Sequence, residues 1–155
     1  RDSYENEKFN HACTIRRIAD YIDVENISVI GVRSSERDEL NNAKKDGLNI
    51  YTSLQIRKQG MERVIKEIMR DIDSKPIYLS LDIDVIDPAF APGTGTPEPF
   101  GLHPLDICTC FDDVSSDLIG FDVMEVNPLF DHGQTAMLAA RYIRYCIEKM
   151  SESKH

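Results

Sequence analysis

Two aspartates close one of the most apolar stretches of the chain. Asp82 and Asp84 end the segment PIYLSLDID, and a loop rich in Pro and Gly follows at once. Residues at i and i+2 of a strand point to the same side, so both carboxylates would project toward one point. Carboxylates that close repel each other, so either one takes up a proton or a cation compensates their charge. The spacing therefore predicts a proton-sharing pair or a cation site.

A third carboxylate, Glu125, lies at the end of a second apolar stretch, LIGFDVMEV. Functional groups gather at the carboxyl ends of strands in open parallel sheets, so Glu125 could face the same crevice as the aspartates. Oxygen ligands alone favour Mg²⁺, Ca²⁺ or Mn²⁺, whereas an added imidazole favours Mn²⁺, Fe²⁺ or Zn²⁺. A bare Asp-x-Asp is common, so this spacing alone leaves the site open. Asp87, directly before Pro88, is predicted to shape a turn.

The elements that must position these carboxylates alternate between strands and helices. Apolar, β-branched runs predict buried parallel strands at 27–32, 48–51, 76–84 and 118–126. Apolar residues at i, i+3 and i+4 predict helices at 11–22, 61–72, 104–114 and 135–150. The charged segment 33–47 is interpreted as a helix or loop with a solvated face. The alternation predicts a single α/β domain, residues 1–155, with a mainly parallel sheet between helices.

Two helical stripes are expected to point inward. The first consists of Ile15, Ile18, Ala19 and Ile22, and the second of Met137, Leu138, Tyr142, Tyr145 and Cys146. Both follow the spacing of an amphipathic helix that packs on a sheet.

The composition limits the classes of partner. The chain has 155 residues, of which 41% are hydrophobic and 29% charged, and its net charge is −9. An acidic chain is a poor ligand for nucleic acid or an anionic membrane, and no apolar run approaches the ~18–20 residues that span a bilayer. The charge suits a cationic ligand or metal ions, and it suits a solvated surface equally well. The four cysteines lack zinc-site spacing and are expected to be reduced thiols of a cytoplasmic protein.

The loop after the aspartate pair carries a longer pattern. Residues 80–101 read SLDIDVIDPAFAPGTGTPEPFG, and this stretch resembles, without a gap, a signature of the ureohydrolases, the arginase and agmatinase superfamily. Segment 120–128, GFDVMEVNP, is similar to the late strand of that superfamily. Segment 4–17, YENEKFNHACTIRR, resembles the region that follows a D-A-H-x-D metal motif in agmatinases. The similarity covers nearly the whole chain.

The resemblance implies a three-layer arginase-like fold and a binuclear Mn²⁺ site. Asp82 and Asp84 would be two of the ligands, with one carboxylate bridging the metals. His11 would shuttle protons, Glu125 would pair with the guanidinium group of the substrate, and Thr96 would line the pocket near it. A hydroxide held by two metals at neutral pH would attack the guanidinium carbon, and His11 would help to protonate the departing amine. The products would be urea and an amine.

Two ureohydrolase motifs do not occur in the 155 residues, namely a G-G-D-H strand end and D-A-H-x-D. The chain therefore resembles the C-terminal half of such an enzyme. We expect it to be inactive alone, because it lacks the remaining metal ligands, and to associate through an uncovered sheet face. By analogy with the family, the parent protein would be a homo-oligomer, either a trimer or a hexamer.

The expected substrate is a small guanidino compound, and agmatine is the first choice, with putrescine and urea as products of a step in polyamine biosynthesis. Segment 1–10 follows the agmatinase pattern, and PEPFGL at 97–102 differs from the Val-rich continuation of arginases. Asn10 stands where agmatinases often have serine. Arginine, guanidinobutyrate and formiminoglutamate remain alternatives within the superfamily. A different class is a non-catalytic domain that keeps the fold for assembly, with a weak cation site at its aspartate pair.

Overall fold

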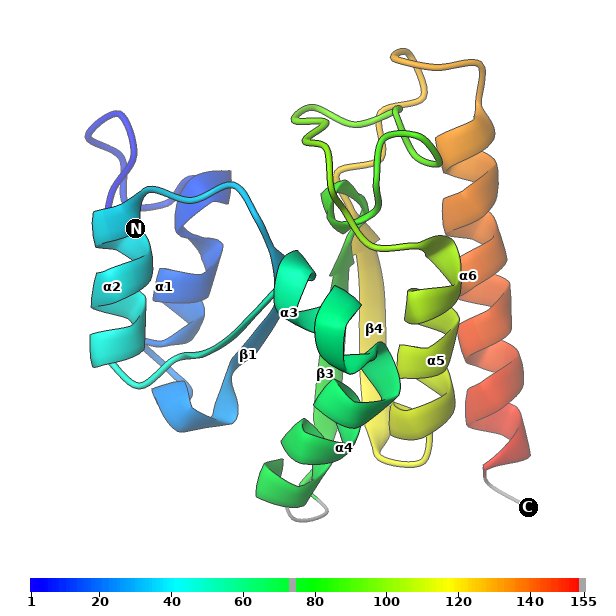
Figure 1. The fold of residues 1–155 in the computed structure, drawn as a ribbon, viewed down its shortest axis with the longest axis horizontal. Helices are drawn as coiled ribbons and strands as arrows, with labels where there is room; N and C mark the ends of the chain where they lie inside the picture. Colours follow the sequence, from blue (N-terminus) through cyan, green and yellow to red (C-terminus); the bar gives the residue numbers. More distant parts are fainter. Residues whose placement is uncertain (73–74, 154–155) are drawn as a thin grey trace.

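Strands and helices alternate along the chain in the computed structural model, which describes residues 1–72 and 75–153. Within these residues the strands form two parallel pairs (Figure 1). Strand β1 (Ser28–Val32) pairs with β2 (Asn49–Thr52), and β3 (Ile77–Asp82) pairs with β4 (Leu118–Met124). The α/β class and the parallel direction are confirmed. The predicted single sheet is divided into two pairs in the described residues, since no strand there pairs with both β1–β2 and β3–β4.

Six α-helices and three short 3-10 turns precede, connect or follow these strands in the described residues. The helices are α1 (Thr14–Ile18), α2 (Arg37–Lys45), α3 (Ser53–Gln59), α4 (Met61–Ile72), α5 (Pro104–Val114) and α6 (Gln134–Glu152). The 3-10 turns are η1 (His11–Cys13), η2 (Val24–Asn26) and η3 (Ile83–Val85). Helices α4 and α5 have the predicted bounds, and α6 begins and ends within two residues of the prediction.

The helix predicted at 11–22 is much shorter in the structure. A 3-10 turn replaces its beginning, and α1 ends at Ile18. Two residues expected to point inward are therefore solvent-accessible, with Ile15 38% exposed and Ile22 48% exposed. Met137 is likewise 71% exposed. The buried stripe of α6 runs through Thr135, Ala139, Tyr142 and Cys146, and Met137 lies off that stripe.

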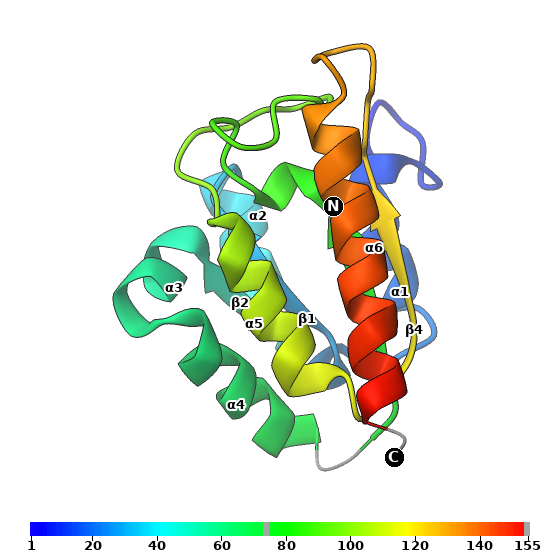
Figure 2. The ribbon, with the colours of Figure 1, turned by 90° about the vertical axis from the view of Figure 1, so that its right-hand side faces the viewer.

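The hydrophobic core lies between β3–β4 and three helices. Figure 2 shows α4, α5 and α6 side by side along this layer, and each helix contacts the next. Phe111 of α5 is fully buried at the centre, with its ring edge-on to Phe121 of β4 and Tyr142 of α6. The Tyr142 hydroxyl donates to the Pro104 carbonyl at 3.0 Å, so the buried phenol has a partner.

The opposite face of β3–β4 is open in the described residues. Side chains of β3 alternate, so that Leu79 and Leu81 face the helices while Tyr78, Ser80 and Asp82 face away. Tyr78 is 62% exposed. The Tyr78 hydroxyl donates to Asp122 Oδ2 at 2.8 Å, and the Ser80 hydroxyl donates to Asp122 Oδ1 at 2.7 Å. The open face thus ends at the acidic pair and agrees with the uncovered face expected of a half-sheet.

The state of the cysteines matches the prediction of reduced thiols. All four cysteines are free thiols, and burial raises the pKa of Cys110 to about 12. Along the part of the chain that the structure describes, no helix combines the length and the apolar character that crossing a membrane requires.

Helix α3, a short helix without a marked apolar period, begins with a capping box. The Thr52 hydroxyl accepts from the Gln55 N–H at 3.2 Å, and Gln55 Oε1 accepts from the Thr52 N–H at 2.8 Å. Because this exchange satisfies two backbone donors, Thr52→Ala should lower the free energy of unfolding by about 1 kcal/mol. Thr52→Ser keeps the acceptor and should retain most of the stability. Equal losses for both variants in urea denaturation would contradict the capping role.

Candidate metal and substrate site

The acidic pair lies where β3 turns into η3. Asp82 is the last residue of β3, and its Oδ1 accepts from the Asp84 N–H at 2.9 Å. The prediction that both aspartates extend from one strand is wrong, because Asp84 belongs to the 3-10 turn that Asp82 caps. The carboxylates are still neighbours, since the charge of Asp84 acts on Asp82. A local turn, rather than strand alternation, brings them together.

Two threonine hydroxyls hold the Asp84 carboxylate from the loop that arches over the ends of β3 and β4 (Figure 1). Thr94 is 1% exposed, and its hydroxyl bonds to Asp84 Oδ1 and lies 3.1 Å from the Glu125 carbonyl oxygen. The Thr96 hydroxyl donates to Asp84 Oδ2. Thr96 was predicted to line a pocket near Glu125; its hydroxyl bonds to Asp84, and its role in the pocket stays a prediction. Thr94, which links Asp84 to Glu125, was missed. The pair of hydroxyls at i and i+2 in GTGTP was the available signal.

Glu125 follows β4 directly and adopts a strained backbone. Its φ is 63°, in the left-handed region that a side chain disfavours by roughly 1–3 kcal/mol. Its side chain is exposed. The Thr94 hydroxyl beside its carbonyl is one contact that holds this conformation. Strain of this kind tends to occur at functional positions, so Glu125 stays in the candidate site.

The charges of two neighbouring carboxylates act on Asp82. Desolvation by the surrounding protein is the largest cause of a raised pKa of about 6 at Asp82, and the charges of Asp84 and Glu125 act in the same direction. The Asp84 N–H and the charge of Arg33 oppose the rise. The Asp82 side chain nevertheless keeps solvent access on the open face of β3, so a cation can reach it. The site therefore carries excess negative charge that a proton or a cation would neutralise.

The donor set fits part of a metal site. Carboxylate oxygens suit a hard divalent cation such as Mn²⁺. Among residues 1–72 and 75–153, no three His, Cys, Asp or Glu side chains gather closely enough to hold a metal ion. Asp82 and Asp84 therefore supply two carboxylates, and a complete coordination shell needs further donors.

His11 lies in a different part of the fold. It opens η1, its side chain is exposed, and its ring packs edge-on to Tyr4 with the centroids 6.2 Å apart. Figure 1 shows this segment beside α1 and α2, on the other side of β1 from β3 and β4. In the described residues, the structure brings Asp82, Asp84 and Thr96 into contact and places the Glu125 backbone beside Thr94, but it gives no contact between His11 and any of them.

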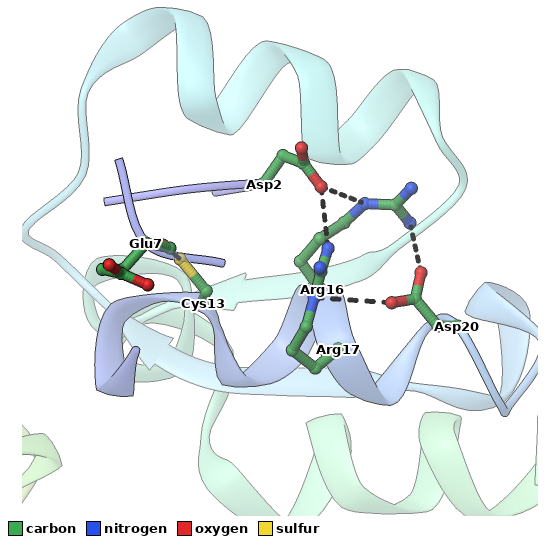
Figure 3. A network of polar contacts seen from close by, with 6 residues as sticks. All are labelled: Asp2, Glu7, Cys13, Arg16, Arg17 and Asp20. Atoms are coloured by element: carbon green, nitrogen blue, oxygen red, sulfur yellow. Dashed lines mark hydrogen bonds and ion pairs between the residues drawn. The ribbon is translucent and has the colours of Figure 1, made fainter. Parts of the chain in front are cut away.

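Ion pairs anchor the segment that carries His11 (Figure 3). Asp2 Oδ1 accepts from Arg17 Nη2 at 2.7 Å and lies 3.7 Å from Arg16 Nε. Asp20 pairs with the same two arginines at 3.4 and 3.8 Å. The chain before η1 is thus tied to α1.

Strand β3 runs parallel to β4 and ends at the acidic pair. This arrangement is typical of α/β proteins that carry their chemistry at the carboxyl ends of their strands. The chain belongs to the Arginase family, whose sequence pattern matches residues 1–148.

Individual relatives support the same membership. The chain is 36% identical over 148 residues to an agmatinase of Bacillus anthracis, which covers 93% of this chain and 49% of the relative. It is 37% identical over 143 residues to the proclavaminate amidinohydrolase of Streptomyces clavuligerus, covering 88% and 45%. The crystal structure of the agmatine ureohydrolase of Thermoplasma volcanium matches with a TM-score of 0.91 at 39% identity, covering 97% and 51%. The resemblance to ureohydrolases is confirmed, and the chain spans about half the length of these relatives.

Proposed function

We propose that this chain takes part in the metal-dependent hydrolysis of a guanidino compound. The observation that carries the proposal is the placement of Asp82, Asp84 and Glu125 at the carboxyl ends of β3 and β4. Asp84 is held by two hydroxyls, and the negative charge around Asp82 is only partly compensated, by the Asp84 N–H and the charge of Arg33. Membership of the Arginase family supplies the reaction class.

Each residue has a role in this proposal. Asp82 and Asp84 would hold Mn²⁺, and further ligands would come from sequence outside these 155 residues, as the half-length match to relatives supports. The bound metal would supply hydroxide at neutral pH. The Glu125 carboxylate would accept two N–H groups of the planar guanidinium and fix its orientation. His11 is proposed as the proton carrier, and only its position in the sequence supports this role.

Agmatine is the proposed substrate, and a trimer or hexamer is the proposed assembly. The similarity to an agmatinase and to an agmatine ureohydrolase favours agmatine. Arginine, guanidinobutyrate and formiminoglutamate are the alternatives in the same class. A non-catalytic domain with a weak cation site is the second candidate, and the partial donor set of the described residues favours it.

Urea release separates these possibilities. With Mn²⁺ and agmatine, the 155-residue chain alone should release no urea, because two carboxylates do not complete the site. A polypeptide that joins it to an N-terminal segment with the G-G-D-H and D-A-H-x-D motifs should hydrolyse agmatine at least about tenfold faster than arginine, roughly 1.4 kcal/mol of discrimination. Faster arginine turnover would overturn the choice of substrate. A folded, manganese-loaded polypeptide that releases no urea would favour the non-catalytic role.

A further inference from the structure

Arg33, the residue after β1, binds the backbone of the loop that carries the acidic pair. Its Nη2 donates to the carbonyl oxygens of Asp84 and Glu98, the latter at 2.8 Å. Its Nε donates to the Glu98 carbonyl at 3.0 Å, and its Nη groups lie 3.5 Å from the carbonyls of Val85 and Ile86. One guanidinium group thus binds both η3, at Asp84, and the loop that follows it, at Glu98. The interpretation of Arg33 as part of a solvated charged face is wrong.

Arg33 binds backbone carbonyl oxygens, although several carboxylates lie in the same region. The structure gives it carbonyl partners and, among the described residues, no carboxylate within ion-pair distance. Its positive charge still acts on Asp82 and Asp87 through space. Arg33 therefore reduces the repulsion in the acidic loop without itself pairing with the carboxylate of Asp82 or Asp84. A lysine could not do the same, because it lacks the planar fork of five N–H donors.

A glycine bulge delivers Arg33 to this position. The β1–β2 register shifts between Ile30 and Val32, at Gly31, whose φ is 84°. A Cβ at Gly31 would lie 2.2 Å from Val85 Cγ2, so only glycine permits this approach of β1 to η3. The bulge turns the end of β1 toward the loop, and Arg33 follows two residues later.

The same loop is held at a second point by α6. The Gly93 N–H donates to the Thr135 hydroxyl at 2.8 Å, and Thr135 is fully buried. A Cβ at Gly93 would lie 2.7 Å from the Asp131 carboxylate. Thr94, the next residue, therefore reaches Asp84 from a fixed backbone. Arg33 on one side and α6 on the other leave the loop little freedom.

We propose that Arg33 is a positioning residue that fixes η3 and the following loop so that the carboxylates of Asp82 and Asp84 converge on a divalent cation. The part about the cation rests on the proposed function; the part about the loop does not. Two measurements therefore test the two parts separately, with Arg33→Ala and Arg33→Lys as variants. Arg144→Ala, which removes a surface pair with Glu148 on α6, is the matched control.

Hydrogen exchange tests the loop without metal. The N–H groups of Asp84, Ile86 and Leu102 all donate to acceptors in or beside η3. In Arg33→Ala these amides should exchange at least tenfold faster than in the wild type, and Arg33→Lys should recover only part of the protection. Arg144→Ala should leave them unchanged. Unchanged exchange in folded Arg33→Ala and Arg33→Lys would overturn the proposal.

Manganese binding tests the consequence for the acidic pair. In the joined polypeptide that carries the G-G-D-H and D-A-H-x-D motifs, titration of Mn²⁺, followed by the electron paramagnetic resonance signal of the free ion, should show binding at least tenfold weaker in Arg33→Ala than in Arg144→Ala. Equal affinity in these two variants would show a purely structural role and overturn positioning. If the wild-type joined polypeptide, which carries the G-G-D-H and D-A-H-x-D motifs, binds no Mn²⁺, the proposed function and the cation part of this proposal both fail, and the exchange data decide the loop part alone.

Discussion

A chain that carries Asp82→Asn is expected to be more stable than the wild type without metal and to lose the stabilisation that Mn²⁺ gives the wild type. The pKa of Asp82 is raised to about 6, so its charged form is disfavoured in the folded state at pH 7. Asparagine removes that charge and can still accept from the Asp84 N–H. The gain should be about 1 kcal/mol, because solvent access screens the interaction.

The pH dependence of this gain has a definite sign. A folded-state pKa above the ordinary value of 3.8 means that the wild type gains stability as pH falls through 6. The advantage of Asp82→Asn should therefore shrink below pH 6 and disappear below 3.8. Thermal unfolding at several pH values, with and without about 10 mM Mn²⁺, measures both effects. Binding at a tenfold excess over Kd would stabilise the wild type by about 1.4 kcal/mol.

Asp87→Asn is the matched control, in the same loop and with the opposite expectation. The Asp87 carboxylate accepts from the Ala89 N–H and the Gly101 N–H, each at 3.0 Å, and these bonds lower its pKa. Asparagine can keep only one of these acceptors, so this variant should be less stable than the wild type at pH 7. Its Mn²⁺-induced stabilisation should remain. If both variants lose stability and both keep the manganese effect, the acidic pair has no special role.

Glu125→Gln should produce the largest loss of activity without loss of metal. In the joined polypeptide, the amide keeps the size of the side chain but cannot form a charged bidentate pair with a guanidinium. Loss of a charged hydrogen-bonded partner typically costs about 2–4 kcal/mol, so kcat/KM for agmatine should fall by roughly 30- to 1,000-fold. The Mn²⁺ stoichiometry should not change. Steady-state kinetics and metal analysis of the same preparation measure both quantities.

Glu98→Gln is the control for Glu125→Gln. Glu98 lies in the neighbouring loop, and its described hydrogen bonds use the backbone carbonyl that Arg33 binds, which the substitution keeps. Its kcat/KM should stay within about twofold of the wild type, which is a few tenths of a kcal/mol. A comparable loss in both variants would indicate a general effect of acidic charge rather than a contact between Glu125 and the substrate.

The long elements could be predicted from the sequence because their signal is local. The i, i+3, i+4 pattern of α4 and the proline start of α5 placed both helices correctly. Helix α3 was missed because a short helix has little periodicity, and only its capping box marks it. Helix α1 is shorter than its apolar spacing predicts, and the ion pairs between Asp2, Arg16, Arg17 and Asp20 that surround it are not revealed by any periodic pattern.

In the candidate site, too, local features could be predicted and contacts between distant residues could not. Asp82 and Glu125 could be predicted because they end apolar stretches, and strand ends are where such groups gather. The turn at Asp84 could not, since it depends on the Asp82 side chain competing with the strand for the Asp84 N–H. Thr94 and Arg33 were missed because their partners lie 10 or more positions away in sequence. The roles of His11, Thr96 and Glu125 in catalysis stay predictions.

The alternation along β3 restricts which changes in length the chain can accept. Leu79 and Leu81 face the helices, while Ser80 and Asp82 face the open side. Inserting or deleting one residue within β3 would exchange the two sets, placing the Asp82 carboxylate among apolar side chains and a leucine at the acidic cluster. Such a change would therefore disrupt both the core and the acidic site. The surface connection between α1 and β1 does not link core and site in this way, so insertions and deletions in sequences that descend from this one should occur there and not in β3.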